Sequence, residues 1–145
     1  MSKKKLFGLN NYAQNLAKET LDGANLRGSL FAHANLTDAS LIKCDLTDST
    51  FTYAKLVRAN LAQATLVRAN FEYADLSEAN LSNSDLTQAN FSQATMRRAN
   101  LSGAYLRESC LANTDLAEAI SNHETVWPEE FDPLKAGIII GSSKG

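Results

Sequence analysis

Every fifth residue from Leu21 to Leu116 is Leu, Phe or Met, without a break or a change of register. The residue two positions before each of these central residues is nearly always Ala, Ser or Cys, so the repeat reads A-(N/D)-L-x-x. A period of five fits neither the 3.6-residue helix nor the two-residue strand. The chain must therefore turn after every five residues.

A second period appears in the Phe residues at the central positions, which are Phe31, Phe51, Phe71 and Phe91. They are spaced by 20 residues each time, so four repeats make one coil. Each residue then stacks on the residue twenty later, at the spacing of paired strands, about 4.8 Å. We expect the central residue and the small residue before it to point inward and the other positions to point outward.

This pattern, from about residue 20 to residue 120, resembles the pentapeptide-repeat protein family. The resemblance implies an all-β solenoid, a right-handed quadrilateral β-helix. We expect a single domain made of an N-terminal tail and cap (1–19), a solenoid of about five coils (20–120) and a C-terminal cap and tail (121–145). The composition of 44% hydrophobic residues and a net charge of −2 fits one folded domain.

Both ends of a solenoid expose its core, so atypical terminal segments are expected to cover them. At the start, Asn10 or Asn11 could cap a short helix with Tyr12, Ala13 and Leu16 on its apolar face and Leu9 packed before it. After Ala119 the repeat stops, and Trp127 and Phe131 are expected to cover the last coil; similar Trp-Pro and Phe-Asp-Pro tails follow the repeats in family members. The run from Ile138 to Ile140 either finishes this cap or pairs two subunits.

The corners between repeats raise a question of turn type. A type II turn needs a positive φ at its third residue. Gly or Asn occupies that position in some repeats, at Gly23, Gly28, Asn83, Gly103 and Asn113. Other repeats place Arg, Gln or Glu there, so a different turn type stays open for them.

The sequence offers few groups for chemistry. His33 and His123 lie about four coils apart and cannot share a metal ion. Cys44 and Cys110 lie more than three coils apart, too far for a disulfide, so two free thiols are expected. The Asp residues that precede central positions, Asp45, Asp75, Asp85 and Asp115, are expected to hydrogen-bond the turn backbone. Without a phosphate loop, nucleophile motif or metal-ligand spacing, we predict no enzyme, no catalytic residue, no cofactor and no metal site.

Outward positions twenty residues apart form columns. Asp38, Arg58, Glu78, Arg98 and Glu118 alternate in sign, which indicates either a self-compensating charge ladder or a charged docking face. Another column is His33, Tyr53, Tyr73, Gln93 and Asn113, with two adjacent Tyr and little charge nearby. Tyr is enriched at protein interfaces, so His33, Tyr53, Tyr73 and Gln93 are the candidate partner-binding surface, and a purely stabilising ladder is the alternative.

The functional hypothesis is a non-catalytic rigid scaffold that binds another protein and is a monomer or weak dimer. The resemblance also raises a second role, because some family members mimic DNA and inhibit a gyrase-type topoisomerase. That role needs a strongly negative surface, whereas 14 Lys and Arg nearly balance 16 Asp and Glu here. No apolar run approaches the ~20 residues of a membrane span. We expect a cytoplasmic protein that binds neither nucleic acid nor membrane, with Lys3, Lys4 and Lys5 in a solvated tail rather than on a lipid surface.

Overall fold

The computed structural model describes residues 10–141, and each five-residue repeat in this range makes one β-turn. In the repeat that begins at Leu41, the Cys44 amide donates to the Leu41 carbonyl at 3.2 Å, and Lys43 has a φ of 60°. A positive φ at the third residue identifies a type II turn. The same positive φ recurs at every fifth residue from Ala13 to Glu118. Corners with Gly, Asn, aromatic and charged residues therefore share one conformation.

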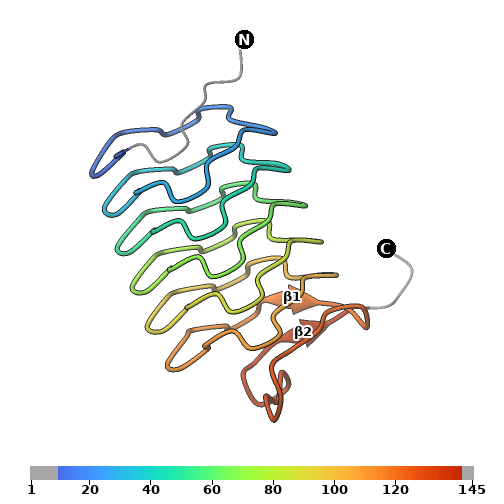
Figure 1. Ribbon diagram of the computed structural model, residues 1–145. Coiled ribbons are helices and arrows are strands. Elements are labelled where there is room, and N and C mark those ends of the chain that lie inside the picture. Colours follow the sequence, from blue (N-terminus) through green and yellow to red (C-terminus); the bar gives the residue numbers. More distant parts are fainter. Residues whose placement is uncertain (1–9, 142–145) are drawn as a thin grey trace.

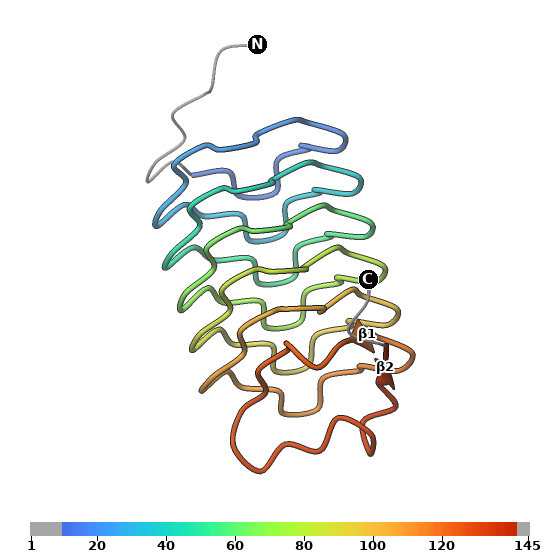
Figure 2. The same cartoon turned by 90° about the vertical axis from the view of Figure 1, so that its right-hand side faces the viewer.

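Backbone hydrogen bonds join each repeat to the repeat twenty residues later. The Leu41 amide donates to the Asn60 carbonyl at 2.7 Å, the Lys43 amide donates to the Ala62 carbonyl at 3.0 Å, and the Asn60 amide donates back to the Ala39 carbonyl at 2.9 Å. Parallel pairs with this step run from Asn10 and Leu30 to Asn100 and Ile120. The result is a stack of four-sided coils (Figures 1 and 2).

Regular strands occur only at the C-terminal end of the described chain. They are β1 (Ile120–Ser121) and β2 (Ile139–Ile140), which pair in parallel. Elsewhere each repeat contributes single paired residues, because the next corner follows before a longer strand can form. Residues 10–141 contain no helix, and thus none that could cross a membrane.

The predicted N-terminal helix over Tyr12, Ala13 and Leu16 is wrong. Residues 11–20 make two further turns of the solenoid, and Ala13 has a φ of 56°. The Leu16 amide donates to the Asn35 carbonyl at 2.7 Å, and the Asn11 amide donates to the Leu30 carbonyl at the same distance. A helix would leave these carbonyls of the next coil without partners, which explains why the ladder prevails.

The Asn10 side chain shows why the helix prediction was attractive. Its Oδ1 accepts a hydrogen bond from the Tyr12 amide at 2.9 Å. The same short-range contact occurs in the repeats, for example from the Thr37 amide to Asn35 Oδ1. The sequence suggested that Asn10 caps a helix, but its side chain instead accepts a hydrogen bond from the backbone of a turn. The predicted contacts of Lys3, Lys4, Lys5 and Leu9, and the predicted fraying beyond Gly141, lie outside the described residues.

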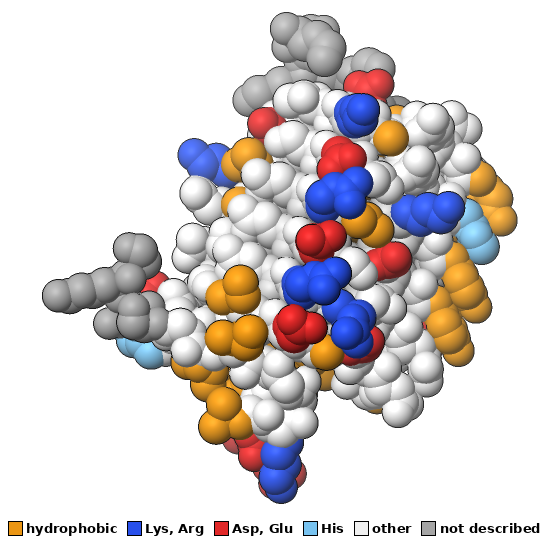
Figure 3. All heavy atoms as spheres, turned by 180° about the vertical axis from the view of Figure 1, so that it is seen from behind, with side chains coloured by type: hydrophobic (Ala, Val, Ile, Leu, Met, Phe, Trp, Pro, Cys, Tyr) orange, Lys and Arg blue, Asp and Glu red, His pale blue; other side chains and the backbone are white. Residues whose placement is uncertain are grey.

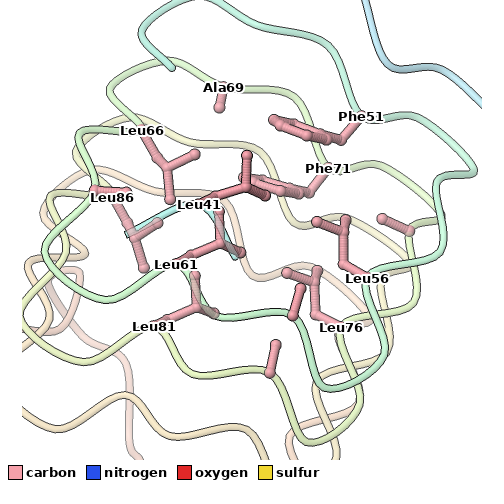
Figure 4. Packing of buried hydrophobic residues seen from close by; sticks show 14 of the residues in the cluster. Leu41, Phe51, Leu56, Leu61, Leu66, Ala69, Phe71, Leu76, Leu81 and Leu86 are labelled. Carbon is pink, nitrogen blue, oxygen red and sulfur yellow. The ribbon is translucent and has the colours of Figure 1, made fainter. Parts of the chain in front are cut away.

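The core is built from the inward positions, as the five-residue pattern predicts. Every central side chain from Leu26 to Leu106 is fully buried, and the small residue before each is nearly so. Figure 4 shows that like lies on like, with Phe51 over Phe71 and Leu41, Leu61 and Leu81 in one column. The small inward residues leave space for these large side chains, so each layer is close-packed.

The C-terminal segment continues the stack with a changed register. Val126 pairs with Tyr105, one residue later than the regular step, and Ile139 pairs with Ile120, one residue earlier. The rings of Trp127 and Phe131 stack at 5.0 Å and pack, partly buried, against the core. Of the three consecutive Ile, Ile138 is buried in the core, whereas Ile139 and Ile140 are exposed on β2. Figure 2 shows the irregular segment below the last regular coil.

Replacing Phe71 with Ala tests the stacked core. Its ring lies 4.7 Å from that of Phe51 and 5.0 Å from that of Phe91, and it is fully buried. We expect the free energy of unfolding to fall by about 3–5 kcal/mol, measured by urea denaturation. Thr52→Ala, at a half-buried outward position, is the control and should change it by no more than ~0.5 kcal/mol. A Phe71→Ala midpoint equal to wild type would contradict the stacked packing.

Gly28 tests the corner conformation, because no atom lies within 4 Å of a Cβ placed there and its φ is +66°. A substitution at this position therefore meets backbone strain without a steric clash. We expect Gly28→Val to lower the free energy of unfolding by about 1–2 kcal/mol, and Gly28→Asn, which tolerates this φ, to lower it much less. Equal stability of the two variants would show that the corner does not impose the left-handed conformation.

Candidate interaction surface

On one side of the solenoid, four successive coils are backed by stacked Phe rings, those of Phe31, Phe51, Phe71 and Phe91. Neighbouring ring centroids lie 4.7 to 5.0 Å apart with interplanar angles of 3° to 7°. We call the outer surface of these repeats, at residues 10–13, 30–33, 50–53, 70–73, 90–93 and 110–113, the Phe face. Its backbone rests on the bulkiest part of the core.

The corner of the Phe face carries a column of stacked aromatic side chains. His33, Tyr53 and Tyr73 occupy the positive-φ corner positions, with φ of 62°, 59° and 62°. The Tyr53 amide donates to the Glu72 carbonyl at 3.1 Å, which fixes one corner on the next. The rings of His33 and Tyr53 stack at 5.0 Å and 6°, and those of Tyr53 and Tyr73 at 4.9 Å and 4°. The first three residues of the column predicted from the sequence therefore form a continuous ring stack.

Tyr12 extends this column and was missed in the sequence. Its ring lies 5.3 Å from that of His33 with a tilt of 55°. Tyr12 stands one position before the corner residue Ala13, and its repeat was read as a helix, so neither spacing nor motif indicated the contact. We call Tyr12, His33, Tyr53 and Tyr73 the aromatic column. Gln93 follows Tyr73 in the same corner position and adds no ring.

The aromatic column is exposed and lies on an almost uncharged surface. Tyr12, Tyr53 and Tyr73 are each about half exposed, at 55%, 52% and 47%. Glu72 is the single Asp, Glu, Lys or Arg residue of the Phe face. Figure 3 shows hydrophobic side chains and a histidine along its right-hand edge, next to a Lys or Arg side chain and to one side of the alternating charges in the middle of the view.

Those central charges are the charge ladder. Arg58 Nε and Nη2 donate to the two carboxylate oxygens of Asp38 at 2.8 and 3.2 Å, and Arg98 lies 4.0 Å from Glu78. The hydrogen bond from Arg58 holds the pKa of Asp38 below its usual range, and the charge of Lys18 contributes in the same direction. Lys18 therefore extends the charge ladder by one residue before Asp38. It was absent from the predicted column, because this segment was predicted to be a helix. The alternating column down the middle of Figure 3 is a set of mutually compensated charges.

Two further Arg residues are compensated in the same way. Arg68 donates to Asp48 at 2.7 Å and lowers the pKa of that carboxyl group. Arg97, which looked unbalanced in the sequence, lies 3.1 Å from Asp115 and 3.9 Å from Glu118. The ion pairs are solvent-exposed, so each contributes little to stability, but together they remove any large field of one sign.

The Asp residues that precede central positions have the structural role predicted for them. Oδ1 of each accepts a hydrogen bond from the backbone amide two residues later, in Asp45, Asp75, Asp85 and Asp115. Asp45 also accepts from the Thr47 hydroxyl at 2.7 Å. These carboxylates are therefore committed to the turns.

The described residues hold no group of three or more His, Cys, Asp or Glu side chains that could bind a metal ion. His33 lies within the aromatic column, far along the chain from His123. An open hollow of about 510 Å³ is lined by Arg107, Glu108, Ser109, Pro128 and Glu129. The hydroxyl group of Ser109 in this hollow donates a hydrogen bond to the Leu106 carbonyl at 2.8 Å, and this bond stabilises the turn.

The two cysteines are free, as predicted, and differ in environment. Cys44 fills a small inward position, and its thiol donates to the Leu21 carbonyl at 3.0 Å. Burial raises the pKa of this thiol to about 11. Cys110 is exposed, with its sulfur 3.1 Å from the Ser92 hydroxyl.

Thiol labelling tests this difference. At pH 8 the native protein is expected to react with one equivalent of a thiol reagent, at Cys110, because the Cys44 thiol is buried and remains protonated. In denaturant without reductant, two equivalents should react. Cys110→Ser should abolish the native reaction. Rapid labelling of native Cys44, or fewer than two thiols after denaturation, would contradict the coil assignment.

Comparisons with known proteins place this geometry in a family. A family model described as a pentapeptide repeat region matches residues 44–120, more than half of the chain, and a model of pentapeptide repeats in eight copies matches residues 20–52. Among functionally curated proteins, no sequence matches.

Two solved structures of pentapeptide repeat proteins agree with the family models. A pentapeptide repeat protein from the Arabidopsis thaliana thylakoid lumen is 29% identical, with a TM-score of 0.62, over 64% of this chain and 65% of its own. The pentapeptide repeat protein Rfr23 from the cyanobacterium Cyanothece 51142 is 28% identical, with a TM-score of 0.52, over 83% of this chain and 89% of its own. QnrB1, a plasmid-mediated fluoroquinolone resistance protein, is 16% identical with a TM-score of 0.44, over 97% of this chain and 86% of its own.

Proposed function

Because this chain belongs to the pentapeptide-repeat family, whose members form right-handed quadrilateral β-helices, we propose that it is a non-catalytic scaffold that binds another protein. The observation that carries the proposal is the aromatic column. It combines exposed aromatic rings, low charge and a fixed geometry on one face of a regular solenoid. Solenoids present such extended surfaces to their partners.

The rings of the column are held in place before any partner arrives. Tyr53 is stacked on both sides, by His33 at 5.0 Å and by Tyr73 at 4.9 Å. Behind the rings, the backbone is tied from coil to coil and rests on the Phe stack. Binding then costs little side-chain entropy, which is the general advantage of a preorganised surface. Tyr also combines a large apolar body with a hydroxyl group that can hydrogen-bond a partner.

The charged columns are less suitable as the binding face. Arg58 is engaged by Asp38, and Arg68 by Asp48. A partner that recruited these guanidinium groups would first have to break existing ion pairs. The Phe face requires no such exchange, because Glu72 forms no ion pair with a described residue.

The same compensation argues against DNA mimicry. A mimic must present a continuous negative field to a site built for phosphate groups. Here 16 acidic residues face 14 basic ones, and six close contacts join the two signs across neighbouring coils. A protein partner recognised through aromatic contacts is the role that the charge distribution favours.

Partner capture by immobilised protein, quantified by mass spectrometry, tests the proposal. We expect Tyr53→Ala with Tyr73→Ala to abolish retention of the partners that wild type retains, because the centre of the column is removed. Tyr105→Ala is the matched control, since Tyr105 is 48% exposed but lies outside the column. It should leave capture unchanged, as should Arg58→Gln with Glu78→Gln.

The double Tyr variant must remain folded for this result to count. Loss of the stacked pair is expected to lower the free energy of unfolding by about 1 kcal/mol, measured by urea denaturation. If the folded double variant still captures every partner, or if only the charge-ladder variant loses them, the binding face lies elsewhere on the solenoid.

A further inference from the structure

We propose that Tyr53 and Tyr73 form a site of oxidative modification. At this site a one-electron oxidant, such as a peroxidase acting with hydrogen peroxide, joins the two rings as dityrosine. The new bond links two neighbouring coils of one molecule. This modification needs no protein partner, so it goes beyond the proposed function.

The backbone ladder holds the two side chains in register. Tyr53 and Tyr73 occupy equivalent corners of successive coils, with φ of 59° and 62°, so both side chains leave the backbone in the same direction. The Tyr53 amide donates to the Glu72 carbonyl at 3.1 Å and ties one corner to the next. The ring centroids lie 4.9 Å apart with an interplanar angle of 4°. Each ring carbon next to the hydroxyl-bearing carbon therefore lies opposite its counterpart at about the same separation.

The exposure of the two rings gives them room to approach each other. Tyr53 is 52% exposed and Tyr73 is 47% exposed. Neither hydroxyl group forms a hydrogen bond with a described residue. A carbon–carbon bond of about 1.5 Å requires the rings to tilt toward each other. Exposed side chains change rotamer on the picosecond to nanosecond timescale, so this movement leaves the backbone in place.

The chemistry is a two-electron oxidation of the pair. Each tyrosine gives one electron to the oxidant and loses its phenolic proton, which leaves a radical shared between the oxygen and the carbons ortho to it. The two radicals form a carbon–carbon bond between one ortho carbon of each ring. The hydrogen on each of these carbons then moves to the phenol oxygen, so both rings regain aromaticity and both hydroxyl groups. The two electrons and two protons released by the pair reduce one hydrogen peroxide to two water molecules.

Tyr53 and Tyr73 are the one adjacent pair among the four Tyr of the chain, all of which lie within the described residues. Tyr12 is separated from Tyr53 by the ring of His33, which contacts both. Tyr105 is 48% exposed but makes no ring contact with a described residue. A radical on Tyr105 must therefore meet a second molecule, whereas a reactant held alongside couples much faster than one in dilute solution.

Oxidation of the dilute full-length chain with a peroxidase and hydrogen peroxide tests the site. We expect the monomer band of a reducing gel to gain dityrosine fluorescence and its mass to fall by two hydrogen atoms. The reducing gel removes disulfide-linked dimers formed through Cys110. After tryptic digestion, the link should join peptide 44–55, which contains Tyr53, to peptide 69–97, which contains Tyr73.

Conservative variants identify the residues that react. Tyr73→Phe keeps the ring but removes the hydroxyl group, and it should lower dityrosine in the monomer by at least about tenfold, as should Tyr53→Phe. Tyr105→Phe, which changes an equally exposed Tyr outside the pair, is the matched control and should leave the yield unchanged. Circular dichroism confirms that each variant is folded. The isolated cross-linked monomer should unfold at a higher urea concentration than untreated protein, because the bond closes a loop in the unfolded chain.

Three results would overturn the inference: no dityrosine in the wild-type monomer, dityrosine confined to covalent dimers, or an undiminished yield in the folded Tyr73→Phe monomer. The proposed function is tested separately, because partner capture is measured without an oxidant. Cross-linking without capture contradicts the scaffold alone, and capture without cross-linking contradicts the modification site alone.

Discussion

Contacts throughout the solenoid depend on the backbone hydrogen bonds that join each repeat to the one twenty residues later. Because this step is constant from Asn10 to Ile120, a residue meets its own equivalents above and below, and similar side chains form columns. Inside, this places Phe51 on Phe71; outside, it places Tyr53 on Tyr73 and Arg58 beside Asp38. Core packing, ring stacking and ion pairing are thus three results of one ladder.

The ladder also explains why unfavourable residues occupy the corners. Left-handed backbone costs about 1–2 kcal/mol for a residue with a Cβ atom. Arg58 nevertheless has a φ of 58°, and its amide donates to the Ser77 carbonyl at 3.0 Å. Any other corner geometry would break that hydrogen bond and misplace the next central side chain. Hydrogen bonding between coils therefore overrides the preference of each corner residue for a negative φ. As a result, each outward corner side chain has a fixed position.

Much of this arrangement could be predicted from the sequence, because period and residue size determine which side chains point inward. The prediction of the N-terminal segment was wrong, because polar residues replace the apolar residues of the repeat there. Asn11, Gln14 and Glu19 occupy inward positions of the first turns, so the apolar signal vanishes although the backbone ladder continues. Tyr12 and Lys18 were consequently missing from their columns.

At the other end of the solenoid, the register change at Val126 depends on packing between segments and has no local motif. The stacking of Tyr53 on Tyr73 follows from spacing alone, whereas partner binding depends on a second molecule and stays a prediction.

The charge ladder has a longer repeat than the backbone that carries it. Lys18, Asp38, Arg58, Glu78, Arg98 and Glu118 alternate in sign, so equivalent charges recur only after two coils. Duplicating one coil within the gene would preserve every turn and every core layer, yet it would bring like charges into contact along this column, which is unfavourable. Duplicating two coils would keep the alternation intact. Growth of this solenoid by pairs of coils is therefore electrostatically easier than growth by single ones.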